Sequence, residues 1–171
     1  MGQVGVSSTA GQFSADAYLA VVGKRQGAVK GESQTPGHVD EITVLTWHWG
    51  VTSPTATGTN QATGRRVYEV LKIDKHIDAS STKLMNALSH NEEIKSATLS
   101  LRKAGTDEDF FIVVLKDARV VGCQIQYQAG GALHETVSIA YQSIDITYHP
   151  QQSSGLRGAS SSFSDSFSTA D

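Results

Sequence analysis

The sequence predicts a mainly β fold: a small β-barrel of two packed sheets with one α-helix and a long extended loop. Three observations lead to this prediction. Most apolar residues in the middle of the chain alternate with polar ones, which is the pattern of half-buried strands. Only one segment repeats its apolar residues every three or four positions, as an amphipathic helix does. A stretch near the C-terminus changes phase, as strands do at a bulge or at a barrel corner.

The first predicted strand is Ala17–Val22, a short apolar segment that is followed by Gly23. The second is Ile42–Trp49, which is β-branched and aromatic and contains no Gly or Pro, and the third is Arg65–Ile73. Residues 52–64 separate the last two strands and consist of small and polar residues with one proline. A loop of this length inside a compact domain is usually functional or disordered.

Asp78–His90 is the one segment with helical periodicity, because its apolar residues recur at spacings of three and four. Asp78, Ser80 or Ser81 can cap the start of this helix. The same serines open a Ser-x-x-Lys pattern that ends at Lys83, which is the acylation motif of penicillin-recognising enzymes. The partner motifs Ser-Asp-Asn and Lys-Thr-Gly are missing, so we interpret the serines as a helix start.

The later strands show three different patterns. Residues 97–101 alternate, and the segment after Arg119 has four apolar side chains on one parity: Val121, Cys123, Ile125 and Tyr127. Phe110–Leu115 is apolar on both parities, so this strand is either covered on both faces or offers one face to a partner. In Val137–Tyr148 the apolar parity switches near Gln142. Either a bulge there keeps both sets on one side, or the strand bends and serves two sheets.

Composition divides the chain into three parts. Residues 1–16 are predicted to be a flexible N-terminal extension, residues 17–151 the barrel domain, and residues 152–171 a serine-rich C-terminal tail. The serine content predicts that the tail is mobile. Phe163 and Phe167 are the aromatic residues through which it can dock on the body.

Charge and hydropathy exclude several classes of function. The net charge of −3, without a basic cluster, argues against a nucleic-acid partner. A single cysteine excludes an internal disulfide and fits a reducing compartment. The apolar runs are far shorter than the roughly 20 residues of a membrane-spanning helix, so we expect no membrane insertion. The first 16 residues lack Lys, Arg and a long apolar region, so no signal peptide is predicted.

We expect no catalytic, cofactor-binding or metal-binding residues, and therefore no enzyme. His38 lies near Asp40 and Glu41, but this cluster has neither a helical pair of histidines nor a cysteine knuckle. We interpret His134 as the start of a strand and Cys123 as a small core residue. An enzyme is an alternative that rests only on the Ser-x-x-Lys match and the scattered histidines.

Trp47-His48-Trp49 is the most informative tripeptide of the chain. Two tryptophans two residues apart lie on one face of a strand, and Leu45 shares that face. Burial of such large side chains anchors a core. We therefore expect Val44, Thr46 and His48 to face away from the interior of the barrel.

Several stretches occur in a distinctive order: Lys30-Gly31-Glu32-Ser33, Asp40–Gly50, Ile73–Met85, Leu101-Arg102-Lys103-Ala104-Gly105, Val137–Pro150 and Tyr148-His149-Pro150-Gln151. Together they resemble the Hcp family, the haemolysin-coregulated, tube-forming proteins of type VI secretion systems. The resemblance runs from Tyr18 to Gln151. The chain departs from the family at both ends, through its longer N-terminal extension and its serine-rich tail.

The resemblance implies hexameric rings that stack into an inner tube. A contractile sheath drives this tube, which carries a spike protein at its tip and small effector proteins in its lumen. It also implies a protein that is cytoplasmic before assembly and is then secreted through the apparatus without a signal peptide.

Residue by residue, the resemblance makes Thr46 and His48 candidates for the lumen wall. It makes the long loop the extension that reaches the adjacent ring. The candidates there are Thr52, Ser53, Thr55, Thr57, Asn60 and Gln61. The strand that is apolar on both faces gives Phe110, Ile112 and Val114 as candidates for the contact between subunits of one ring. The competing hypothesis is a stand-alone β-sandwich that binds a small ligand in an aromatic-lined pocket and forms no ring.

Overall fold

The computed structural model describes residues 14–150 and 158–167, which form twelve strands and one helix. Residues 1–13 of the predicted extension (residues 1–16), and the tail residues 151–157 and 168–171, lie outside the described residues, whereas Ala15 and Asp16 are the first residues of β1. The elements in the first half are β1 (Ala15–Gly23), β2 (Gly27–Val29), β3 (Ile42–Val44), β4 (Thr46–His48), β5 (Val51–Thr52), β6 (Val67–Tyr68) and β7 (Leu71–His76). Those in the second half are α1 (Ser81–Ser89), β8 (Ile94–Lys103), β9 (Asp109–Gln126), β10 (His134–Ala140), β11 (Ser143–Tyr148) and β12 (Ser161–Ser166).

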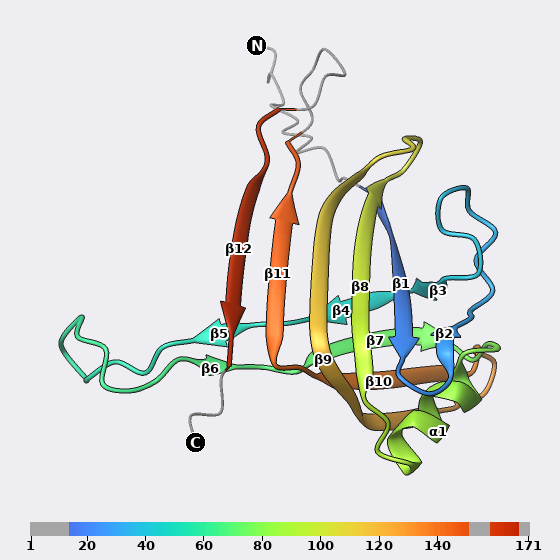
Figure 1. Ribbon diagram of the computed structural model, residues 1–171, viewed down its shortest axis with the longest axis horizontal. Helices are drawn as coiled ribbons and strands as arrows, with labels where there is room; N and C mark the ends of the chain where they lie inside the picture. Colours follow the sequence, from blue (N-terminus) through green and yellow to red (C-terminus); the bar gives the residue numbers. More distant parts are fainter. Residues whose placement is uncertain (1–13, 151–157, 168–171) are drawn as a thin grey trace, which may run out of the picture.

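Two antiparallel layers share the 18-residue strand β9. We call them the front sheet, which runs β2-β1-β8-β9-β11-β12 with β3 also beside β1, and the back sheet, which runs β9-β10-β7-β4. The strands of the back sheet cross behind those of the front sheet at a steep angle (Figure 1). Within the described residues, hydrogen bonds do not join β4 back to the front sheet. The mainly β prediction with one helix is therefore confirmed, although the barrel is not closed.

Chain segments pass from one sheet to the other at three corners. β9 bends at Asp117, whose φ of 48° is a left-handed conformation that Asp tolerates better than most residues. β10 pairs with β9 in the back sheet, whereas β11 pairs with β9 in the front sheet. Of the two explanations for the phase change near Gln142, the bend between two sheets is therefore confirmed.

The third corner corrects the prediction of one continuous strand over Ile42–Trp49. The segment is divided into β3, which pairs with β1, and β4, which pairs with β7. Leu45 lies between them and is 43% exposed, whereas Val44 is buried in the core, contrary to the expectation that it faces away from the interior. Leu45 does not share the buried face of the tryptophans, because the chain turns at this residue to enter the other sheet.

The core lies between the two sheets and is built from aliphatic side chains. Its fully buried members come from seven strands and include Leu19, Ile42, Leu71, Ile73, Leu99, Leu115, Ile139 and Ile144. Leu84 and Ala87 of α1 are also buried, so the helix covers one end of this core. Full burial of one such side chain stabilises the fold by about 1.5–3 kcal/mol.

A buried polar cluster joins α1 to the back sheet. The Lys75 ammonium group has no exposed surface and contacts Glu135 Oε2 at 2.8 Å, Asp78 Oδ1 at 2.9 Å and Ser81 Oγ at 2.9 Å. The Asp78 carboxylate also accepts hydrogen bonds from the backbone N–H and the hydroxyl of Ser80. The serines of the Ser-x-x-Lys pattern therefore serve the helix start, while Lys83 is exposed.

The prediction of a mobile tail, which was based on serine content, is wrong for residues 161–166. These residues form β12, which pairs with β11 along its whole length, from Ser143↔Ser166 to Tyr148↔Ser161. Backbone hydrogen bonds join these two strands, and they do not depend on side-chain hydropathy. Phe163 is 40% exposed.

The second half of β9 also differs from the expected pattern. The register shifts between Ser138 and Ile139 of β10, so Val120 is buried and Val121 is 50% exposed. Beyond this irregularity, Ile125 and Tyr127 are 53% and 70% exposed. The alternation along this strand therefore does not mark one continuous buried face.

Candidate assembly surfaces

Residues 51–68, which we call the arm, extend from the body as a narrow ribbon (Figure 1). Its base is the pairing of β5 with β6, Val51↔Tyr68 and Thr52↔Val67. A further bridge joins Thr55 to Ala62, so the predicted long loop is a ladder for part of its length. All six residues predicted for ring stacking lie on the arm and are exposed: Thr52, Ser53, Thr55, Thr57, Asn60 and Gln61.

Four aromatic rings, which we call the aromatic base, hold the arm at its root. Tyr68 of β6 lies 4.4 Å from Phe167 and 6.4 Å from Trp49, measured between ring centroids. Tyr141 lies 5.8 Å from Phe167, and its hydroxyl accepts a hydrogen bond of 2.5 Å from Trp49 Nε1. The same hydroxyl donates to the Glu69 carbonyl oxygen at 3.0 Å, and burial raises the pKa of Tyr141. The aromatic base thus joins the arm to the β10–β11 corner and to the end of β12.

A hydrogen bond adds a second link between the arm and β12. The Tyr68 hydroxyl donates to Asp165 Oδ2, and the Ser166 backbone N–H donates to Asp165 Oδ1 at 2.9 Å. The bond to Asp165 raises the pKa of Tyr68, and the bond from Tyr68 lowers the pKa of Asp165. Of the two aromatic residues expected to dock the tail on the body, Phe167 does so and Phe163 is 40% exposed. The end of the tail thus positions the arm.

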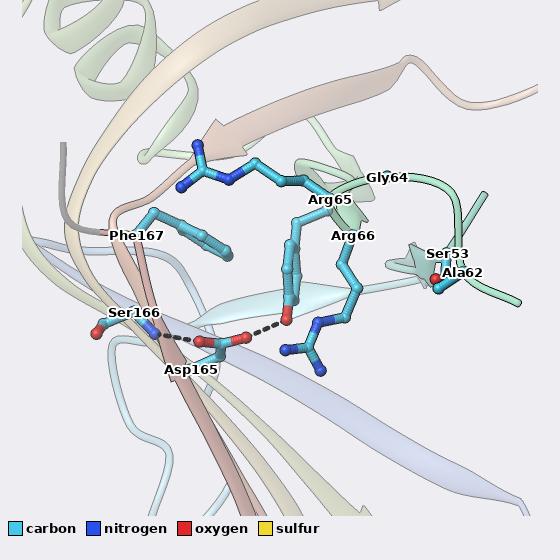
Figure 2. A pocket seen from close by; sticks show the side chains of 9 residues that line it. Ser53, Ala62, Gly64, Arg65, Arg66, Asp165, Ser166 and Phe167 are labelled. Carbon is cyan, nitrogen blue, oxygen red and sulfur yellow. Dashed lines mark hydrogen bonds between the residues drawn. The ribbon is translucent and has the colours of Figure 1, made fainter. Parts of the chain in front are cut away.

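A groove lies between the arm and the end of β12 (Figure 2), with a volume of about 840 Å³. Arg65 extends above Phe167 in this view, and Arg66 extends toward Asp165. Among the described residues, neither guanidinium group forms a hydrogen bond or an ion pair. Other residues that line the groove are Ser53, Ala62, Gly64, Tyr68 and Ser166. We call this site the arginine groove.

The outer face of the back sheet carries Thr46 and His48, as predicted. Both are exposed, whereas Trp47 is half-buried and stacks on Phe111 with ring centroids 6.0 Å apart. His48 Nε2 lies 2.8 Å from Glu69 Oε2. The Thr46 hydroxyl donates to Asp74 at 2.6 Å, and hydrogen bonds from Thr136 and Thr46 lower the pKa of Asp74. This face is polar.

The outer face of the front sheet carries Phe110, Ile112 and Val114, all of which are half-buried. They alternate with Val113 and Leu115, which are buried in the core. The two-faced apolar pattern therefore arises because one parity fills the core and the other faces outward.

Sequence reasoning missed the role of His38. Its Nδ1 lies 2.8 Å from Glu41 Oε2 and its Nε2 lies 2.9 Å from Asp109 Oδ1, while Arg102 Nε donates to the same Asp109 oxygen at 3.0 Å. The imidazole also stacks on Tyr18 at 4.3 Å. These contacts hold the β2–β3 loop against the front sheet. Over residues 14–150 and 158–167, no group of three His, Cys, Asp or Glu side chains could hold a metal ion.

The arginine groove was also missed, although one signal for it was present. Arg65 and Arg66 are the only charged residues between Glu41 and Glu69 apart from the histidine at position 48. Adjacent charges at the end of a long uncharged loop are unusual. Their neighbour Asp165 could not be found from local patterns, because it is about a hundred positions further along the chain.

The remaining described features concern Cys123, His134 and the question of a membrane-spanning helix. The Cys123 thiol is half-buried beside the core, and burial raises its pKa, in agreement with its interpretation as a small core residue. His134 is the first residue of β10, as predicted. In the described ranges, no helix has the length and apolar character needed to cross a membrane.

Comparison with known proteins gives consistent matches. A model of the protein family described as "Type VI secretion system effector, Hcp" matches residues 18–148. "Protein hcp1" of Pseudomonas aeruginosa is 32% identical, over 77% of this chain and 84% of the relative. "Major exported protein" of the same organism is 28% identical, over 81% of this chain and 92% of the relative. A solved "type six secretion system protein" has 27% identity and a TM-score of 0.78, over 90% of this chain and 96% of that one.

Proposed function

The chain belongs to the Hcp family of type VI secretion proteins, and from this premise we propose that it forms hexameric rings that stack into the inner tube of the secretion apparatus. The observation that carries the proposal is the arm. It projects a ribbon of exposed residues beyond a well-packed body and is held in one direction by the aromatic base. Such an extension has no role in packing its own body, but it suits contact with another ring.

The lumen wall is assigned to the outer face of the back sheet. Thr46 and His48 are exposed there, and their hydrogen bonds to Asp74 and Glu69 make this face hydrophilic. A hydrophilic wall suits a channel that small effector proteins enter and leave. Replacement of His48 by Gln should alter cargo retention and leave thermal stability unchanged, because the side chain is 70% exposed.

The contact between subunits of one ring is assigned to Phe110, Ile112 and Val114. These apolar side chains face outward from β9 in the centre of the front sheet, between β8 and β11. Burial against the next subunit would remove their remaining apolar surface from water and stabilise the ring.

The arm is assigned to the contact between rings. Its six exposed polar candidates carry no charge and little bulk, so backbone pairing and shape are the means of contact. The further partners are the contractile sheath, the spike protein at the tip and small effectors in the lumen. In this role the protein is structural rather than catalytic. It is cytoplasmic before assembly and leaves through the apparatus without a signal peptide.

One observation favours a second candidate, a monomeric ligand-binding module. Tyr68, Tyr141 and Phe167 line a shallow depression next to Val70, which is the kind of aromatic wall that a small ligand uses. This candidate requires that the protein remain a monomer.

Light scattering after size exclusion, followed by negative-stain images, tests the proposal. A mass near six times the 18.2 kDa of the chain, with annular particles, is the expected result. A monomer at every concentration would contradict ring formation and would direct attention to the ligand-binding module. Replacement of Ile112 by Lys should convert the hexamer to a monomer, whereas Lys83→Glu on the exposed side of α1 should not.

A further inference from the structure

The arginine groove presents two guanidinium groups in a chain whose net charge is −3. Arg65 and Arg66 are exposed, and neither guanidinium group forms a hydrogen bond or an ion pair with a carboxylate among the described residues. The charge of Arg66 contributes to the lowered pKa of Asp165 from a longer distance. Among the described residues that line the groove, Asp165 is the one carboxylate, and it already accepts hydrogen bonds from Tyr68 and from the Ser166 backbone. The groove therefore has the chemistry to bind carboxylates, with which guanidinium groups form paired hydrogen bonds.

An acidic turn lies at the other end of the front sheet. Residues 104–108 join β8 to β9, and Asp107 and Glu108 are exposed on it. The turn has a defined shape, because the Thr106 N–H and hydroxyl both donate to the Lys103 carbonyl oxygen, at 3.1 and 2.9 Å. Gly105 supplies the left-handed φ of 81° that the turn requires.

The two features lie at opposite ends of the same sheet, so they cannot meet within one molecule. The turn lies next to the pair Arg102↔Asp109 of β8 and β9. At the end of β12, Ser166 pairs with Ser143 of β11, and Ser143 in turn pairs with Lys116 of β9. Seven residues of β9 separate Asp109 from Lys116, which corresponds to about 23 Å at 3.3 Å per residue. Figure 1 shows the β8–β9 turn and the end of β12 at opposite ends of the front sheet.

Complementary surfaces at opposite ends of a molecule produce a head-to-tail contact. Such a contact does not close on itself when copies are related by translation, and it therefore repeats along a filament. The volume of about 840 Å³ is enough for a short turn of chain.

We propose that the acidic β8–β9 turn of one copy seats in the arginine groove of the copy in the next ring, where Arg65 and Arg66 bind Asp107 and Glu108. This inference rests on the proposed tube and names the partner of the arm in it. The groove is formed jointly by the arm and β12, so the aromatic base that fixes their relative position also shapes the contact.

Charge reversal tests the inference. Variant R65E/R66E presents acidic groups at both ends of the ring, and variant D107K/E108K presents basic groups at both ends. Each variant alone should form rings of unchanged mass that do not stack. An equal mixture should recover tubes, because each groove then meets a turn of opposite charge. Light scattering measures the rings, and sedimentation with negative-stain images measures tube length.

The controls separate the possible outcomes. Variant K83E/K95E lowers the net charge by the same amount as R65E/R66E, but at exposed positions of α1 and β8. It should stack as the wild type does. D107K alone repeats the test with a smaller change at the turn, and the melting temperature of every variant verifies its fold. Stacking of the wild type should weaken as salt rises from about 0.05 to 0.5 M, because the Debye length shortens.

Three results would overturn the inference while leaving the ring intact. The first is normal tubes from both reversed variants, and the second is a mixture that does not recover stacking. The third is a wild-type ring that does not self-associate at low salt. Loss of tubes in R65E/R66E that is reversed by deletion of residues 168–171 would assign the groove to the chain's own C-terminus instead. Absence of rings in the wild type would contradict the proposed function itself.

Discussion

The body and the arm are built by different interactions. In the body, side chains such as Leu99 and Ile139 have no exposed surface, and the long strands β1 and β9 each pair with β8 over many residues. In the arm, every residue from Val51 to Val67 except Ala56 is exposed, and the aromatic base and the Tyr68–Asp165 bond hold the ribbon at its root. Stability is therefore concentrated in the body, and the direction of the arm depends on a few contacts. Measurements of unfolding and of assembly should separate these two regions.

The largest effect on the body is expected from the buried charge cluster. The side chains of Lys75 and Glu135 have no exposed surface. Lys75→Ala removes the cation and leaves the Glu135 carboxylate buried without its partner. Denaturant unfolding should show a loss of about 3–5 kcal/mol. The double variant K75M/E135L removes both charges and should recover most of this loss. A loss below about 1 kcal/mol for K75A would show that the cluster is not a structural element of the body.

Leu99→Ala sharpens the contrast between body and arm. Leu99 is fully buried between the sheets, so the substitution should lower the free energy of unfolding by about 3 kcal/mol through lost burial and a cavity. Thr57→Ala on the arm should change it by less than about 0.5 kcal/mol. Equal effects of the two substitutions would mean that the arm packs on the body in solution.

Phe167→Ala tests the aromatic base. Phe167 is half-buried against Tyr68 and Tyr141, so its loss should cost about 1 kcal/mol of stability. Hydrogen exchange at the Glu69 amide, which donates to the Gly50 carbonyl oxygen at the root of the arm, should become faster. Phe163→Ala within β12, the strand that ends just before Phe167, is the matched control and should leave this exchange rate unchanged, because the Phe163 side chain is 40% exposed.

The smallest effect is a dependence on pH. The hydrogen bond from Tyr68 holds the pKa of Asp165 below its ordinary value of 3.8. A lowered pKa in the folded state stabilises the fold fully above the ordinary pKa, and this contribution is lost as pH falls through the folded-state value. Asp165→Asn removes the titration, so the difference in melting temperature between wild type and variant should shrink as pH falls from 6 to 2. A difference that stays constant would contradict the role of the ionised carboxylate.

Local patterns in the sequence predicted the parts of the fold that depend on apolar side chains. The alternation around Leu99, the periodicity of the helix, and the packing of Trp47 and Trp49 against the core all follow from burial. The phase change near Gln142 marked a sheet corner because burial must switch parity there. Sequence also placed the stacking candidates on one exposed segment.

Features that depend on backbone pairing or on distant partners could not be predicted. β12 is held by main-chain hydrogen bonds to β11, which its serines do not reveal. The register shift that buries Val120 and exposes Val121 has no local signal. The Tyr68–Asp165 bond joins positions that only the folded sheet brings together.

The pairing of β1 with β8 also sets the order in which the chain can fold. Leu19 pairs with Leu99, so this edge of β1 stays unpaired until a segment about 80 residues later in the chain has been made. The strands β8, β9, β10 and β11 pair with near neighbours in sequence, and short loops close faster than long ones. During synthesis the apolar segment Ala17–Val22 can therefore pair with β2 and β3 early, whereas the edge that pairs with β8 stays open until β8 has left the ribosome. We expect this nascent strand to be the part of the chain most in need of a chaperone.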